Sequence, residues 1–182
     1  MQATWPGLAS DLSVASDFSR RSADKTPTGF SRTPSMPHVK VWVHYVWTTK
    51  NREPLLTDDI RHLVFDHIRE NARAKGIYLD HIGGYREHAH SLISLGVDQT
   101  LANIPKLLKG ESSHWINQQG LCKTKFAWQH EYFVVGVCES IIERTRAYIQ
   151  RQEIHHRAKP FDAEFDQMLR KYGFERYHDD DA

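Results

Sequence analysis

The segment from Val39 to Trp47 (VKVWVHYVW) restricts the fold more than any other part of the chain. It is rich in β-branched and aromatic residues, a composition typical of a β-strand. Alternate side chains of a strand point to opposite faces of the sheet, and here both alternating sets are largely apolar. The pattern therefore predicts a central strand that is covered on both sides.

The rest of the sequence predicts an alternation of helices and strands around this first strand. The expected elements are a helix from Asp58 to about Lys75, strands at 77–82 and 86–95, a helix from about Asn103 to Gly120, a strand at 131–137, a helix from about Ser140 to His155, and a helix from about Asp162 to Tyr172. Gly83-Gly84 is expected to form a tight turn that joins two antiparallel strands. The order βαββαβ predicts an α+β fold, with a ferredoxin-like (RRM-like) antiparallel sheet, helices packed on it and further C-terminal helices.

Composition divides the chain into three parts. Residues 1–37 are rich in Ser, Thr, Pro and Arg and lack sustained periodicity, which predicts a disordered or loosely attached N-terminal extension. Residues 38–176 carry the periodic pattern of a folded domain. Residues 177–182 form an acidic tail that contains Asp179-Asp180-Asp181.

Charge and cysteine content narrow the functional classes. The net charge of +1 excludes a uniformly basic surface, so any nucleic-acid contact must be a local patch. No apolar run approaches the roughly 20 residues that a membrane-spanning helix needs. Cys122 and Cys138 lack the spacing of a zinc knuckle and are too few for a disulfide framework. They indicate a reducing compartment, and we expect a cytoplasmic protein without a membrane partner.

Two histidines, His88 and His90, lie two residues apart in the third expected strand, so both imidazoles should share one face. They fit half of a metal site or a pair of proton carriers. With 12 His in 182 residues, however, about 0.8 such pairs are expected by chance. Tyr148 and Gln152 share one face of the helix from Ser140 to His155. A Gln152 amide near the histidines would complete an N/N/O ligand set, which suits Mg²⁺ or Mn²⁺ with a phosphate.

Several motifs in fixed order support a common site for the two histidines, Tyr148 and Gln152. They are VWVHYVWTTKNR at 41–52, HAH at 88–90, LLKGESS at 107–113, FAWQ at 126–129, YIQRQ at 148–152 followed by His155-His156, and FDAEF at 161–165 with Tyr172-Gly173. Together they resemble the single-tyrosine HUH transposases of the insertion-sequence 200/605 type, including relatives associated with repetitive extragenic palindromes.

The resemblance implies a DNA transposase that cleaves and rejoins single-stranded DNA at hairpin-marked ends. Tyr148 would be the nucleophile and would form a 5′-phosphotyrosine link. His88, His90 and Gln152 would hold Mg²⁺ or Mn²⁺, and Glu87 would orient a histidine. The resemblance also implies a homodimer in which the tyrosine helix acts at the partner's metal site, in the bacterial cytoplasm or nucleoid. A domesticated, repeat-processing nuclease of the same family is an alternative.

In the light of the resemblance, six polar residues are candidate DNA contacts: Lys50, Arg52, Lys106, Lys109, Ser112 and Ser113. Trp128 and Tyr132 fit either stacking on unpaired bases or packing in the core. His44, His155 and His156 are left outside the catalytic set. Two other readings are a ferredoxin-like module that binds single-stranded nucleic acid without cutting it, and a structural zinc pair at His88 and His90.

Overall fold

The computed structural model describes residues 38–156 and 161–175, which belong to one compact unit, Pro37–Ala182. The predicted N-terminal extension and acidic tail lie outside these residues, so the three-part division of the chain stays a prediction. Among the described helices, none has the length and apolar character needed to cross a membrane.

Four strands form one antiparallel sheet in the order β2-β3-β1-β4. They are β1 (Trp42–Thr48), β2 (Tyr78–Gly84), β3 (His88–Ser94) and β4 (Phe133–Val137). The first strand pairs with β3 on one side and β4 on the other, as its apolar faces predict.

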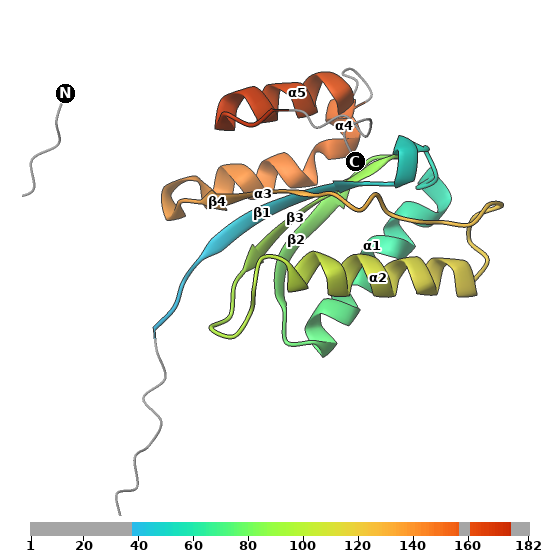
Figure 1. Ribbon diagram of the computed structural model, residues 1–182, viewed down its shortest axis with the longest axis horizontal. Helices are drawn as coiled ribbons and strands as arrows, with labels where there is room; N and C mark the ends of the chain where they lie inside the picture. The colour runs from blue at the N-terminus through green and yellow to red at the C-terminus, as the bar shows by residue number, and fades with distance from the viewer. Residues whose placement is uncertain (1–37, 157–160, 176–182) are drawn as a thin grey trace, which may run out of the picture. The chain divides into compact units, whose positions relative to one another are not determined.

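Helical segments connect and follow the strands. They are η1 (Lys50–Arg52), α1 (Asp58–Ala74), α2 (Asn103–Gln118), η2 (Glu139–Ile141), α3 (Ile142–Gln150), α4 (Gln152–His156) and α5 (Phe161–Tyr172). Figure 1 shows α1 and α2 on one face of the sheet and α3, α4 and α5 on the other. The predicted α+β fold with the order βαββαβ and added C-terminal helices is confirmed.

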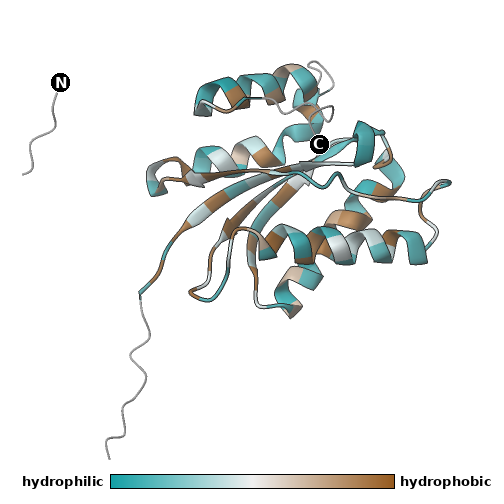
Figure 2. Ribbon diagram, in the orientation of Figure 1, coloured by the Kyte–Doolittle hydropathy of each residue, from teal (hydrophilic) through white to brown (hydrophobic). Residues whose placement is uncertain are grey.

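The face under α1 and α2 holds the main hydrophobic core. Its strand residues are Val43, Tyr45, Trp47, Ile82, Ala89 and Ile93, which pack with α1 and α2 residues such as Val64, Ile68, Ile104 and Leu108. Hydrophobic residues recur along the strands in Figure 2, whereas long stretches of α2 and α5 are hydrophilic. This face is therefore stabilised mainly by burial of apolar surface.

The opposite face carries two smaller apolar clusters. One joins Trp42 and Leu92 to Ile142 and Ile149 of α3, and the other joins Val46 and Phe133 to Phe161 and Leu169 of α5. The side chains of His44, His88 and His90 are buried on this same face. Polar groups with this degree of burial need partners, and those partners define the site described below.

The expected turn at Gly83-Gly84 is wrong. Both glycines belong to β2, and residues 85–87 make the connection to β3. A Cβ atom on Gly83 would overlap the backbone carbonyl of Ile149, and one on Gly84 would overlap the carbonyl of His88. Gly83 is thus needed for the close approach of α3 to the sheet, rather than for a turn.

The expected continuous helix from Ser140 to His155 is also wrong. It is divided into η2, α3 and α4, with an interruption at Arg151, whose backbone has φ −94° and ψ 9°. The side-chain amide of Gln152 donates to the Tyr148 carbonyl at 3.4 Å, next to this interruption. Tyr148 and Gln152 therefore belong to two consecutive short helices.

Candidate metal and nucleophile site

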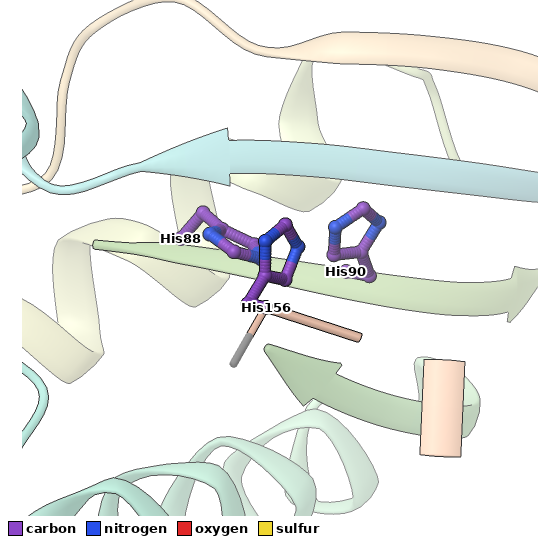
Figure 3. Close-up of side chains that lie close together, drawn as sticks. All are labelled: His88, His90 and His156. Carbon is purple, nitrogen blue, oxygen red and sulfur yellow. The ribbon is translucent and has the colours of Figure 1, made fainter. Parts of the chain in front are cut away.

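His88 and His90 extend from β3 toward α3–α5, and both side chains are fully buried. Their ring centroids are 5.0 Å apart in an edge-to-face arrangement. The period of two along the strand places them on the same face, while Ala89 between them points into the core under α1 and α2. Figure 3 shows both imidazoles together with a third, that of His156.

His90 is held through one ring nitrogen while the other is left without a hydrogen bond. Its Nδ1 lies 3.1 Å from His44 Nε2, and the two rings are stacked. Its buried Nε2 has no hydrogen-bond partner within the described residues, and Glu164 Oε1 lies 3.9 Å away. Burial, with the neighbouring imidazoles, lowers the pKa of His90 well below its ordinary value. Burial and the charge of Lys171 lower the pKa of His44 to about 4. His90 is therefore neutral, the form that binds metal ions.

His88 is positioned at both ring nitrogens. Its Nδ1 lies 3.2 Å from Glu87 Oε1, the partner expected from the sequence, and its Nε2 lies 3.3 Å from Gln152 Oε1. Two ligands of one ion at about 2.1 Å each are separated by roughly 3.0–3.4 Å. The His88–Gln152 pair has that spacing, and the unbonded Nε2 of His90 supplies a third donor on the same face. These residues fit a divalent cation.

Glu87 supports this arrangement electrostatically. Burial alone would raise the pKa of its carboxyl, but the hydrogen bond with His88 and the electrostatic effect of the neighbouring histidines outweigh burial and lower the pKa. An ionised Glu87 at Nδ1 keeps the proton of His88 on that nitrogen and leaves the Nε2 lone pair for a ligand.

Tyr148 lies beside the histidines of its own chain. Its half-buried ring is edge-on to His90 at 5.5 Å and to His44 at 6.1 Å between centroids. The predicted nucleophile and the three predicted metal ligands thus meet within one chain.

Contacts from β2 fix the position of α3, the tyrosine helix that carries Tyr148. Arg146, two residues before Tyr148, donates to both carboxylate oxygens of Asp80 at 2.8 and 2.9 Å. His81 bonds to Asp80 at 2.6 Å and to Gln150 at 2.8 Å. With the close packing of Gly83 against Ile149, these bonds hold α3 on β2. A bidentate Arg–carboxylate pair gives orientation as well as attraction.

The structure adds His156 and Glu164 to the site, neither of which the sequence predicted there. The ring of His156 lies 4.4 Å from that of His88, and ligand atoms of His88, His90 and His156 all lie within 4.8 Å of one another. The His156 Nε2 lies 2.6 Å from Glu164 Oε2. Burial and the nearby Glu87 raise the pKa of Glu164 to about 7. His156 follows Gln152 by four residues, so helical spacing could have predicted that the two share a face. No spacing in the sequence connects Glu164 with the site.

The six candidate DNA contacts occupy different environments. Lys50 and Lys106 are exposed, and Ser113 is half-buried. Arg52 forms an ion pair with Asp162 and lies over the rings of Phe161 and Phe165. Lys109 donates to the carbonyls of His130 and Glu131 at 2.7 and 3.2 Å.

Ser112 does not fit a DNA contact. Its side chain is fully buried in α2, where its hydroxyl donates to the Leu108 carbonyl and accepts from Trp128 Nε1. Trp128 is likewise buried in the core, whereas Tyr132 is 37% exposed. The α2 residues also lie on the face of the sheet opposite the histidines.

Comparison with known protein families identifies the family of this chain. The family model described as "Transposase IS200 like" matches residues 38–152, well over half of the chain. The chain belongs to the IS200-like transposase family. The matched segment ends at Gln152 and so contains the predicted nucleophile and all three predicted ligands. His156 and Glu164 lie beyond it.

Two solved structures share the fold of this IS200-like transposase. One is described as a candidate transposase from Deinococcus radiodurans, with 23% identity, a TM-score of 0.52, and coverage of 70% of this chain and 98% of that chain. The other is a REP-associated tyrosine transposase bound to a REP hairpin, with 14% identity, a TM-score of 0.51, and coverage of 71% and 74%. No curated protein sequence matches this chain.

Proposed function

We propose that this transposase cleaves and rejoins single-stranded DNA at hairpin-marked ends through a 5′-phosphotyrosine intermediate. The proposal depends above all on one observation. The Tyr148 ring lies 5.5 Å from the ring of His90, whose buried Nε2 makes no hydrogen bond within the described residues. The hairpin-bound REP-associated transposase with the same fold supports the choice of substrate.

His88, His90 and Gln152 are the proposed ligands of a divalent cation, Mg²⁺ or Mn²⁺, with His156 close enough to join them. Held by these residues, a divalent cation would supply Lewis-acid polarisation of the scissile phosphate. His44 and Glu87 hold the two histidine rings in the orientation that presents Nε2.

Tyr148 is the proposed nucleophile. Its phenolic oxygen loses its proton and forms a bond to phosphorus while the bond from phosphorus to the 3′ oxygen breaks, and the departing oxygen takes up a proton to become a 3′-hydroxyl. The phosphodiester energy is kept in the tyrosine link, so attack by a 3′-hydroxyl reverses the step without ATP. Asp80 and Arg146 contribute by holding the tyrosine helix in place.

A covalent adduct assay tests the proposal. Labelled single-stranded hairpin DNAs are incubated with the protein and Mg²⁺ or Mn²⁺ and separated on a denaturing gel. Wild type should give a protein–DNA adduct, and Tyr148→Phe should give none. Tyr78→Phe is the matched control, because Tyr78 is 62% exposed on β2 and should be dispensable. Equal adduct from Tyr148→Phe, or none from wild type over a broad hairpin set, would refute the mechanism.

The arrangement within one chain also favours catalysis in cis, although the family resemblance implies a homodimer with exchanged tyrosine helices. A mixture of Tyr148→Phe and His88→Ala proteins distinguishes the two. If Tyr148 acts on its own histidines, the mixture should stay inactive. If it acts on a partner's histidines, mixed dimers should recover part of the wild-type adduct.

A further inference from the structure

A wide bulge interrupts the pairing of β1 with the segment that leads into β4. Thr49 bridges Trp128 at one end, and Val46 pairs with Phe133 at the other. Between these pairs β1 has two residues, Trp47 and Thr48, whereas the opposing segment has four, 129–132. Two surplus residues push that segment away from the sheet. Bulges of this kind are common next to active sites, where they redirect side chains.

The bulge opens onto a cavity of about 730 Å³ between the end of β1, residues 129–134 and α5. Tyr132, Phe165 and Phe174 are among its lining residues. Phe174 is 50% exposed and its ring lies beside Phe133 on the α5 face, whereas the ring of Tyr132 lies beside Tyr45 and Lys109 on the α2 face. The amide side chains of Asn51 and Gln129 and the guanidinium of Arg52 also line it. The cavity thus combines accessible π faces with hydrogen-bonding groups.

Two features hold the cavity in shape. Lys109, from α2, donates to the carbonyls of His130 and Glu131, and its ammonium lies 5.7 Å from the ring of Tyr132. Asn51 and Arg52 both have a positive φ, 55° and 56°, which is unfavourable for residues other than glycine. The Asn51 N–H donates to Gln129 Oε1 at 3.3 Å and so joins this loop to the bulge. Backbone strain of this type is concentrated at functional sites.

The cavity adjoins the histidine site. Val46 and Thr48 line it, and their register partners on β3 are His90 and His88. Neighbouring strands are about 4.8 Å apart, so the cavity begins one strand away from the proposed metal ligands. A nucleotide whose phosphate lies at the histidines can therefore place an adjoining base in the cavity.

We propose that this cavity binds an unstacked nucleobase of the single strand, next to the scissile phosphate. Phe174 offers a stacking surface, and the amides of Asn51 and Gln129 can bond to the edge of the base. The proposal rests on the proposed function for the position of the phosphate. In this proposal, residues of the bulge determine which base is accepted beside the cleaved phosphate.

Equilibrium DNA binding in EDTA tests the cavity separately from catalysis. The parent protein carries Tyr148→Phe, so that no strand is cut, and the probes are fluorescent 20-mers of deoxyadenosine and a 20-mer of abasic tetrahydrofuran nucleotides. In this parent, Phe174→Ala should weaken binding of the adenine 20-mer by about fivefold to a hundredfold, the range for one stacked base. Binding of the abasic 20-mer should be unchanged, because it offers no base.

Tyr78→Ala is the matched control, since it removes an exposed aromatic ring from the far edge strand β2. The proposal is overturned if Phe174→Ala binds the adenine 20-mer as the parent does, if it loses equal affinity for the abasic 20-mer, or if the parent does not discriminate the two probes. Phe174 is half exposed and lies after α5, so Phe174→Ala should fold as the parent does. Base-dependent binding that needs Phe174, without a covalent adduct from wild type, would refute the proposed function and leave only the base-binding cavity standing.

Discussion

The two faces of the sheet are made by the same strands but are held together differently. Under α1 and α2, residues such as Tyr45 and Ile93 form a dry apolar core. On the other face, His44 and His90 alternate with them and are almost as deeply buried. Because successive strand residues point to opposite faces, each strand serves a stabilising core and a chemical site at once.

Specific polar pairs take over part of the stabilising role on the histidine face. Asp80–Arg146 joins β2 to α3, and Arg61, reaching from α1, bonds to Glu153 of α4 at 3.0–3.1 Å. Such pairs depend on geometry and on pH, whereas apolar burial is largely insensitive to both. The histidine face should therefore be the more easily disturbed by pH and by small displacements.

A matched pair of substitutions in β3 should separate the two faces most strongly. Ile93 and His90 are both fully buried, three residues apart on opposite faces. Ile93→Ala should reduce the free energy of unfolding by about 2–5 kcal/mol, the usual range for a large-to-small core change. His90→Leu keeps most of the buried volume, so it should cost about 1 kcal/mol, the worth of the hydrogen bond to His44, yet abolish adduct formation. Urea unfolding and the adduct assay measure the two effects. Similar stability losses would contradict the division between the faces.

The next effect concerns the contact between β2 and the tyrosine helix. Gly83→Ala should displace α3, because the added methyl group overlaps the Ile149 carbonyl, and overpacking of this kind costs about 1–3 kcal/mol. Adduct formation should fall by more than tenfold, because small misplacements of a nucleophile are costly. Gly136→Ala in β4 is the control, since its added methyl group meets no atom within 4 Å. A Gly83→Ala protein with unchanged adduct yield would show that this close packing does not position Tyr148.

Much of the fold could be predicted because it depends on local periodicity. The two apolar faces of residues 39–47 fixed a central strand, and Gly76, with φ 67°, ends α1 as expected from its place after the helix pattern. The errors at Gly83-Gly84 and Arg151 have a different origin. The conformation at Gly83 depends on how closely α3 approaches β2, and the interruption at Arg151 is accompanied by a side-chain bond to the backbone. Hydrophobic periodicity in the sequence predicts neither.

The site was predictable in part for the same reason. Strand spacing brought out His88 and His90, which lie within β3. Helix spacing brought out Tyr148 and Gln152, which are four residues apart although α3 ends between them. His156 belongs to the short helix after an interruption, and Glu164 reaches the site from α5. The role of Ser112 was misjudged because exposure, rather than residue type, decides whether a hydroxyl can meet DNA. Contacts between distant elements require the folded structure.

The polar pair at Asp80 gives a pH-dependent prediction. Burial opposes ionisation of Asp80, but the hydrogen bonds from Arg146 and His81 and their charges outweigh it and lower its pKa. Stability from a depressed carboxyl pKa is present above the unfolded value of about 4 and is lost as the pH falls through the folded value. Asp80→Asn should thus unfold a few degrees lower than wild type at pH 7, and the difference should shrink below pH 4. Thermal unfolding from pH 7 to pH 3 measures this, and a constant difference would contradict the assignment.

The smallest effect should come from Lys109, the cation that holds the bulge from the apolar side of the sheet. Burial lowers the pKa of Lys109 to about 8, although Glu131 partly opposes the shift. The unfolded chain keeps this proton up to about pH 10.4, so between pH 8 and pH 10 the unfolded state binds more protons and stability should rise with pH. Lys109→Met lacks this contribution. The free energy of unfolding of wild type, relative to that of Lys109→Met, should therefore increase with pH. Urea unfolding at pH 7.5, 8.5 and 9.5 measures this difference. A difference that does not change with pH would show that Lys109 stays fully solvated. Because a neutral amine can still donate to the carbonyls of His130 and Glu131, the bulge should keep its shape while its charge is lost.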